Sequence, residues 1–189
     1  MAKKLKILIF PDPRLRKVAK KVLKFDKSLE NLANDMLKTM YEANGIGLAA
    51  TQIAIDKRLI VMDCGKTKYE TQNISEEEYD EKIKDEQFEP FPIKMINPEI
   101  ISLGKNLEER EEGCLSIPGY NAKIKRPSSL KVKYTDENKK DNIIDAEGLL
   151  ATCIQHEIDH LNGILFIDHL SKLKREIILK KAIKEYSKN

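Results

Sequence analysis

Apolar residues recur with helical spacing in three stretches of the chain. In residues 29–42 they follow i, i+3, i+4 and i+7 spacing, and Ser28 is the expected N-cap. Residues 147–161 carry a wider apolar face, typical of a buried helix, and Asp145 is the expected cap. Residues 172–186 have one apolar side and one lysine-rich side. The pattern predicts three helices, the second of which lies at the centre of the fold.

Shorter apolar or alternating runs predict strands in the rest of the chain. The clearest alternation, Leu-Lys-Val-Lys-Tyr at 130–134, indicates a half-buried strand. Few crossover helices separate these runs, which favours antiparallel pairing. We therefore expect an α+β fold, with antiparallel sheets packed around the central helix and with a C-terminal helix. The predicted strands are 6–10, 58–64, 93–103, 115–117, 121–125, 130–134 and 143–146.

Length and composition narrow the class of protein. The 189 residues suit one domain spanning 1–189. No apolar run approaches the roughly 18 residues of a membrane helix, so we expect neither a membrane protein nor a secretory signal. Three cysteines are too few and odd in number for a disulfide scaffold, and they favour a reducing compartment such as the cytoplasm.

The net charge of +3 conceals two segments of opposite charge. Residues 66–92 contain nine acidic residues and four lysines and few aliphatic ones, which predicts an acidic surface insertion between two strands. Residues 172–189 contain seven Lys or Arg residues and two Glu, which predicts a basic C-terminal helix on the surface.

The strongest chemical signal is the His-Glu-Ile-Asp-His sequence at 156–160. On a helix, His156 and His160 lie on one face and can bind the same metal ion, with Glu157 beside a metal-bound water. A catalytic site of this type needs a third protein ligand and an open position. The histidine that a metzincin would use falls at Phe166, and the glutamate of a gluzincin would fall near Lys180. The residues at both positions argue against a third metal ligand downstream of His160.

An upstream cysteine, Cys114, is the alternative source of a third ligand, although a free cysteine is more often a small buried hydrophobic residue. Cys114 follows Gly113, which allows close approach of the backbone, and a thiolate is a good ligand for divalent metals. A separate segment, Gly45-Ile46-Gly47-Leu48-Ala49-Ala50-Thr51-Gln52, suggests backbone exposed to a ligand and an amide side chain directed at it. Alone, this segment is a weak signal, since it lacks the preceding strand of a dinucleotide-binding fingerprint.

Together these segments resemble the peptide deformylase family, enzymes that remove the N-formyl group from new bacterial polypeptides. The motifs GxGxAAxQ, EGCLS and QHExxH stand in that order, at 45–52, 112–116 and 155–160, and the similarity runs from 11 to 166. The resemblance implies that Cys114, His156 and His160 bind one divalent metal, Fe(II) in the cell, with zinc, nickel or cobalt able to replace it. It further implies that Glu157 transfers protons and that the Gln52 amide and the Leu115 N–H stabilise the oxyanion.

The resemblance also implies a substrate and partners. An N-formyl-methionyl peptide would enter as an extended strand, and the C-terminal helix would dock on the ribosome near the exit tunnel. We expect a cytoplasmic bacterial enzyme, or one from an organelle of bacterial descent, acting as a monomer on nascent chains. The residues expected to bind the peptide or to line its methionine pocket are Ile46, Gly47, Glu112, Gly113, Leu149, Thr152 and Cys153.

Two other functions compete with this interpretation. One is a different HExxH metallopeptidase. The other is a ribosome- or RNA-binding domain with a structural zinc, closed by Cys64 or Cys153 as the fourth ligand beside the three named above. A closed site would leave Glu157 and Gln52 without a role.

Overall fold

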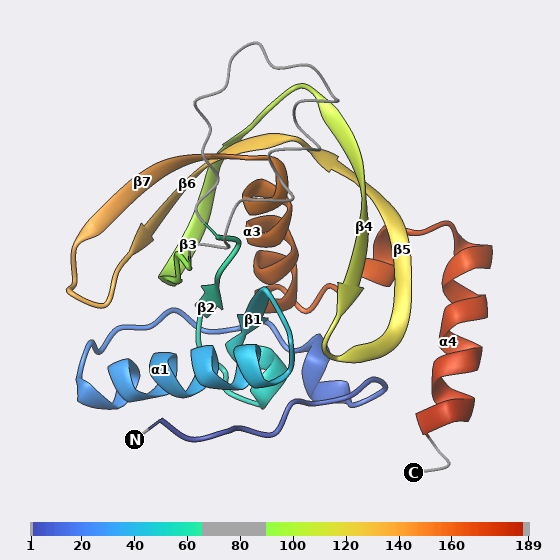
Figure 1. The fold of residues 1–189 in the computed structure, drawn as a ribbon, viewed down its shortest axis with the longest axis horizontal. Coiled ribbons are helices and arrows are strands. Elements are labelled where there is room, and N and C mark those ends of the chain that lie inside the picture. The colour runs from blue at the N-terminus through green and yellow to red at the C-terminus, as the bar shows by residue number, and fades with distance from the viewer. Residues whose placement is uncertain (1, 66–89, 187–189) are drawn as a thin grey trace.

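The computed structural model describes residues 2–65 and 90–186, and these residues form two antiparallel sheets with three α-helices (Figure 1). The larger sheet has the strand order β1-β2-β3-β6-β7, and the smaller one is the hairpin β4-β5. The expected α+β class is therefore confirmed. The strands are β1 (Gly47–Ala49), β2 (Leu59–Met62), β3 (Ile93–Leu103), β4 (Leu107–Cys114), β5 (Ile117–Pro127), β6 (Ser129–Thr135) and β7 (Asp141–Glu147), and the helices are α1 (Lys27–Glu42), α3 (Gly148–Leu161) and α4 (Lys172–Tyr186).

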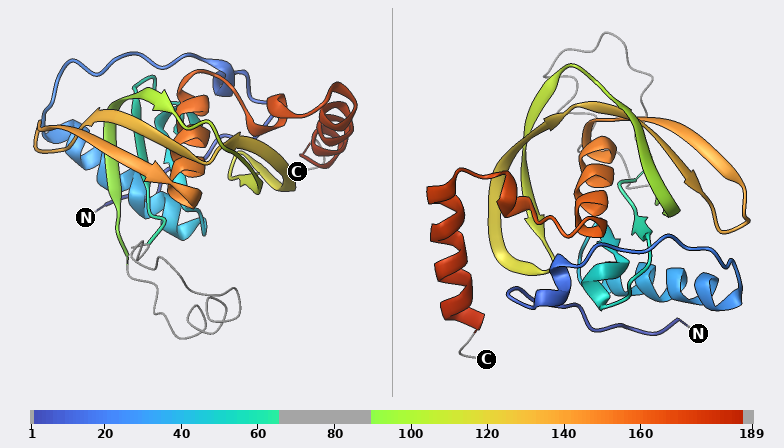
Figure 2. Two further views of the ribbon diagram at one scale, coloured as in Figure 1. Left: turned by 90° about the horizontal axis from the view of Figure 1, so that it is seen from above. Right: turned by 180° about the vertical axis from the view of Figure 1, so that it is seen from behind.

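Strand β2 is buried on both faces, as its uninterrupted apolar sequence requires. Successive side chains point to opposite faces of a sheet. Ile60 and Met62 pack in the core that α3 covers, while Leu59 and Val61 pack in the core that α1 covers. The two helices thus lie against opposite faces of the same sheet, and α3 stands in the middle of the molecule (Figures 1 and 2).

The position of helix α3 is fixed by the segments that precede and follow it and by a contact with β5. Its first residue follows β7 directly, and the Gln155 amide donates to the Pro127 carbonyl at 3.0 Å, which ties the helix to β5. The chain leaves the helix through Gly163, whose φ of +73° suits glycine. A Cβ at this position would lie 2.5 Å from the Arg16 carbonyl oxygen, so no other residue fits without a backbone shift.

The remaining core joins the hairpin to both ends of the described chain. Leu8 and Leu15 pack there with Ile117 and Phe166, and Ile178 of α4 packs against this cluster. Helix α4 lies beside the hairpin, on the side away from α1 (Figure 2), and Ala182 is its one buried residue among the described side chains. None of the helices within 2–65 and 90–186 is long and apolar enough to cross a membrane.

Several sequence-based boundaries were wrong. Helix α1 begins at Lys27 and its N-cap is Asp26, whose carboxylate accepts from the N–H groups of Ser28 and Leu29; Ser28 is inside the helix. Asp145 does not cap α3, because it lies in β7 and pairs with Lys131. The three helices are otherwise found where the periodicity predicts them.

The strand predictions were right in part. Residues 6–10 are not a strand of either sheet and make isolated bonds, such as Leu8 N–H to the Gln52 carbonyl at 2.7 Å. Leu115 and Ser116 form the turn of the hairpin, not a strand. Strands β1 and β4 were not predicted. Apart from residues 90–92, the acidic insertion predicted at 66–92 lies outside the described residues.

Candidate metal centre

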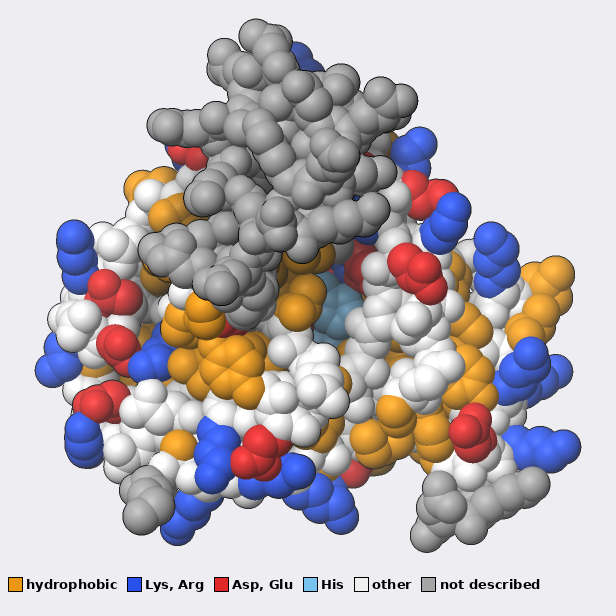
Figure 3. Space-filling view, viewed as in Figure 1, with side chains coloured by type: hydrophobic (Ala, Val, Ile, Leu, Met, Phe, Trp, Pro, Cys, Tyr) orange, Lys and Arg blue, Asp and Glu red, His pale blue; other side chains and the backbone are white. Residues whose placement is uncertain are grey.

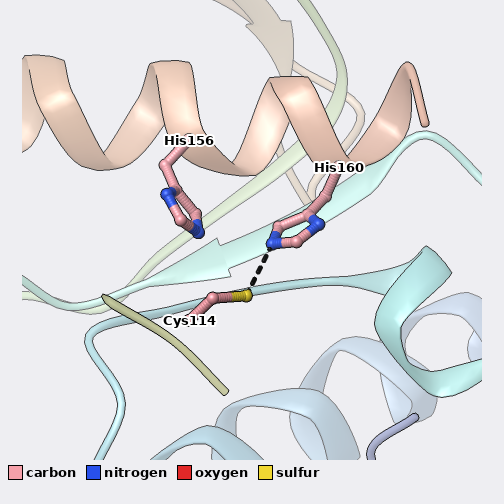
Figure 4. Close-up of side chains that lie close together, drawn as sticks. All are labelled: Cys114, His156 and His160. Atoms are coloured by element: carbon pink, nitrogen blue, oxygen red, sulfur yellow. Dashed lines mark hydrogen bonds between the residues drawn. The ribbon is translucent and has the colours of Figure 1, made fainter. Parts of the chain in front are cut away.

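Three side chains from two elements converge on one point. Cys114 ends β4, and His156 and His160 lie one helical turn apart on α3 (Figure 4). Their ligand atoms all lie within 4.8 Å of one another, and the Cys114 Sγ is 3.1 Å from His160 Nε2. The three residues that the sequence singled out as metal ligands are thus brought together by the fold.

This donor set fits a divalent metal ion. Metal–sulfur and metal–nitrogen bonds of about 2.3 and 2.0 Å put tetrahedral ligand atoms roughly 3.3–3.6 Å apart. The cluster needs only small adjustments to reach that spacing. Burial, followed by the charge of His156, lowers the pKa of His160 well below its usual value, so His160 is neutral, the form that binds metals. Thiolate and imidazole ligands suit several divalent metals and do not distinguish among them.

A buried chain of charges orients His156. Its Nδ1 lies 2.8 Å from the Glu112 carboxylate, which leaves Nε2 for the cluster. Glu112 in turn receives two hydrogen bonds from Arg126, at 2.6 and 3.1 Å. Burial opposes ionisation of Glu112, but the bonds from His156 and Arg126 outweigh it and lower its pKa to about 2. Arg126 also donates to Asp159 at 2.8 Å, and Asp159 lies 2.7 Å from the Nε2 of His169.

Sequence reasoning missed most of this chain of charges. Glu112 was expected at the peptide; it lines the cavity, but its carboxylate is bonded to His156 and Arg126. Arg126 and Asp159 were not predicted at all. Arg126 lies 12 positions from Cys114 in the sequence. The two residues lie on adjacent strands only because β4 and β5 pair as a hairpin, in which Arg126 is opposite Glu108.

Gln52 lies against the cysteine. The Ala49 N–H donates to its Oε1 at 2.8 Å, and its Nε2 donates to the Ser116 hydroxyl at 3.1 Å. The same Nε2 is 3.5 Å from the Cys114 sulfur. Because the Ala49 bond fixes the amide orientation, the NH₂ group is directed toward the metal ligands. Leu115, the other residue expected to contribute a donor, follows Cys114 in the turn and lines the same cavity.

Glu157 is buried beside the cluster with one unused oxygen. Its side chain lies on α3 between the two histidines in sequence, and its Oε2 has no hydrogen-bond partner among the described residues. Burial raises its pKa to about 7, so the group can accept and release a proton near neutral pH. Gly47 makes room for it, since a Cβ there would lie 2.3 Å from Glu157 Oε1.

A cavity of about 600 Å³ opens onto these groups. In Figure 3 a histidine side chain is visible in a hollow near the centre of the face, with hydrophobic side chains around it. All of the residues expected to contact the peptide line this one cavity, which joins β1, β4 and α3. They are Ile46, Gly47, Glu112, Gly113, Leu149, Thr152 and Cys153, together with Gln52, Cys114, Leu115, His156 and Glu157.

The geometry argues against both competing functions. Within 2–65 and 90–186, no fourth His, Cys, Asp or Glu joins the cluster, so Cys64 and Cys153 do not close a structural zinc site. Phe166 is fully buried and its ring lies 6.3 Å from that of His156, while Lys180 is exposed on α4. Among the described residues after α3, none joins the cluster as the further ligand that a metzincin or gluzincin would require.

Comparison with known proteins agrees with this site. The family model described as polypeptide deformylase matches residues 4–176. The peptide deformylase of Agrobacterium fabrum is 46% identical over 178 residues, 94% of either chain, and that of Bradyrhizobium diazoefficiens is 50% identical over 177 residues, covering 93% of this chain and 92% of its own.

Solved structures give the same result. The crystal structure of peptide deformylase from Ehrlichia chaffeensis superimposes with a TM-score of 0.84 at 38% identity, covering 98% of both chains. The structure from Legionella pneumophila gives a TM-score of 0.80 at 44% identity, covering 97% of this chain and 96% of its own. With its cluster of one cysteine and two histidines, the chain belongs to the polypeptide deformylase family, metal-dependent enzymes that remove the N-formyl group from nascent peptides.

Proposed function

We propose that the cavity beside the metal ligands binds the formyl-methionyl end of a peptide and that Glu157 and Gln52 carry out the chemistry there. The observation that carries this proposal is the buried Glu157 carboxylate, which lines the same cavity as Cys114 and His156 and whose Oε2 has no partner in the part of the chain that the structure describes. A purely structural metal site gives no reason to bury an unpartnered carboxylate, because doing so costs several kcal/mol.

Cys114, His156 and His160 would hold a divalent ion. When bound, that ion supplies Lewis-acid polarisation of the formyl oxygen and makes water nucleophilic near neutral pH. We infer Fe(II) as the ion in the cell, with zinc, nickel or cobalt as substitutes, because the family resemblance favours iron and the thiolate–imidazole set accepts all four.

The reaction then divides among the protein's own groups. Glu157 takes the proton of the attacking water and delivers it to the amine nitrogen that leaves. The Gln52 NH₂ and the Leu115 N–H donate to the oxygen of the formyl group as it becomes negative, and each such donor is worth roughly 3 kcal/mol in the transition state. The bond from Ala49 holds the Gln52 amide in the orientation that this role needs.

The peptide backbone has two free strand edges to pair with. Strand β1 pairs only with β2, and β4 only with β5, so each has one edge without a strand partner among the described strands. The cavity lies between these edges, lined by Ile46 and Gly47 on one side and by Glu111, Glu112 and Gly113 on the other. An extended peptide between them gains main-chain hydrogen bonds from both. The methionine side chain enters the apolar part formed by Leu149, Thr152 and Cys153.

Helix α4 is proposed as the ribosome contact. Five of its lysines are exposed, and neutralising RNA phosphates with such residues gives strongly salt-dependent binding. The substrates are then nascent chains in the bacterial cytoplasm. We propose that the enzyme acts on them as a monomer. The five exposed lysines of α4 are Lys172, Lys174, Lys180, Lys181 and Lys184.

Glu157→Gln tests the proposed chemistry. The amide has nearly the same shape but cannot accept the proton, so kcat for a formyl-methionyl peptide falls about 10²–10⁴-fold. Metal content, measured on the same sample, stays at the wild-type level. Glu111→Gln is the matched control, because Glu111 lines the same cavity but is exposed, and it keeps kcat within a few-fold. A Glu157→Gln enzyme with wild-type kcat contradicts the proton-transfer role.

A further inference from the structure

Two cysteines outside the metal cluster lie close together, and one of them, Cys153, lines the cavity. Cys64 follows β2 and is partly exposed, and Cys153 lies on α3 and is buried. The two side chains lie close enough to interact, since each shifts the pKa of the other. They are 89 positions apart in the sequence, so the contact is made by the fold.

A second set of contacts supports the same placement. The Ile46 carbonyl accepts from the Asp63 N–H at 2.9 Å and from the Cys153 thiol at 3.7 Å. Cys153 and Asp63, the residue directly before Cys64, therefore donate to the same carbonyl group. Cys64 also packs against the core cluster that contains Cys153. The third cysteine, Cys114, contacts Gln52, Ser116 and His160 instead.

We propose that Cys64 and Cys153 form a dithiol–disulfide site that hydrogen peroxide oxidises and that a small dithiol restores. The partly exposed Cys64 is the thiol that meets the oxidant, and the buried Cys153 is the thiol that resolves it. Interaction with the Cys153 side chain lowers the pKa of Cys64, which favours its thiolate and agrees with this order.

The oxidation balances in two steps. The Cys64 thiolate attacks one oxygen of hydrogen peroxide, the O–O bond breaks, and Cys64 becomes a sulfenic acid. The hydroxide that leaves takes up from solvent the proton that Cys64 lost on ionisation and departs as water. The Cys153 sulfur then attacks the Cys64 sulfur, the S–O bond breaks, and a second water leaves with the Cys153 proton. Two thiols have lost two electrons in total, and the peroxide has gained them.

Oxidation changes the wall of the substrate cavity. Cys153 lines that cavity, and a Cβ on Gly47 would lie 2.9 Å from its sulfur, so the sulfur also sits against β1. Bonding to Cys64 removes the thiol donor from the Ile46 carbonyl and fixes the sulfur toward β2. The disulfide therefore alters the pocket proposed for methionine and the strand proposed for the peptide. This consequence rests on the proposed function, whereas formation of the disulfide does not.

The test uses metal-loaded full-length enzyme treated with stoichiometric hydrogen peroxide without free iron. Free thiols are alkylated, and the digested protein is examined by mass spectrometry for a Cys64–Cys153 cross-linked peptide. KM and kcat for a formyl-methionyl peptide are measured before oxidation, after it, and after dithiothreitol. Cys64→Ser is the control variant, since Cys64 does not line the cavity and basal activity should be unchanged.

We expect the cross-linked peptide in the wild type, with a several-fold rise in KM that dithiothreitol reverses, and neither effect in Cys64→Ser. If both thiols remain alkylatable, or if peroxide inactivates the wild type and Cys64→Ser equally and irreversibly, the proposal is overturned and the damage belongs to the metal site. A cross-link with unchanged KM confirms the disulfide but removes Cys153 from the methionine pocket, and this outcome separates the two claims.

Discussion

Helices α3 and α4 are both predicted from apolar residues at helical spacing, but they have different places in the molecule. Ten of the 14 residues of α3 are buried, including the polar Gln155, His156, Glu157 and His160. Among the described side chains of α4, only Ala182 is buried. Burying polar groups is costly unless they have partners, so those of α3 indicate a function that exposed lysines do not. The comparison predicts that hydrolysis depends on the surroundings of α3 and hardly at all on α4.

The largest effect is expected where β1 touches α3. Gly47→Ala puts a Cβ 2.3 Å from Glu157 Oε1, so the carboxylate must move, and a displacement of this size costs about 10²-fold in kcat. In Gly45→Ala the new Cβ lies 2.7 Å from the end of the Leu115 side chain, which can rotate away. Steady-state kinetics on a formyl peptide should show a much smaller loss for Gly45→Ala. Equal losses of kcat in the two variants would mean that hydrolysis does not depend on the position of the Glu157 carboxylate.

An intermediate effect is expected in the chain of charges behind α3. Arg126→Lys keeps the charge but cannot make the paired bonds to Glu112, so His156 is less well oriented and metal affinity falls about 10–100-fold. His169 lies at the partly exposed end of this chain of charges, so His169→Asn should change the metal affinity by less than Arg126→Lys does. Chelator competition measures both, with circular dichroism to confirm folding. Wild-type affinity in Arg126→Lys would remove Arg126 from the orientation of His156.

The smallest effect on peptide hydrolysis is expected on α4. Replacing Lys174, Lys180, Lys181 and Lys184 by Gln leaves kcat/KM for a short peptide unchanged, because these side chains are exposed and do not line the cavity. Affinity for ribosomes should fall and become less salt-dependent. The control replaces four exposed lysines near the N-terminus, Lys17, Lys20, Lys21 and Lys24. If both variants bind ribosomes alike, α4 is not the contact.

The same contrast explains what the sequence could predict. Helix α3 and its ligands follow from local spacing, because i and i+4 residues share a face whatever surrounds them. Strand β4 was missed because Leu-Glu-Glu-Arg-Glu-Glu-Gly-Cys has no apolar alternation; pairing with β5 makes it a strand. Arg126 was missed for a related reason, since it lies 14 positions from Glu112 in the sequence and its side chain reaches the Glu112 carboxylate only in the folded hairpin.

Cap positions were the weakest local prediction. Asp26 and Ser28 are both short polar residues before an apolar run, and either could cap α1. The carboxylate of Asp26 accepts from the N–H groups of Ser28 and Leu29, so the N-cap lies two residues earlier than expected. Cys114 could be identified as a ligand only through the order of three motifs, since a single cysteine beside a glycine is no local signal.

The central claim is that the groups around α3 hydrolyse a formyl amide. The most direct test is formate release from formyl-Met-Ala-Ser by enzyme purified without oxygen, with metal content measured on the same sample and acetyl-Met-Ala-Ser as the matched control substrate. We expect one metal per chain, formate released in step with new amine, and much slower cleavage of the acetyl peptide. A chain that carries its metal and releases no formate would contradict the account.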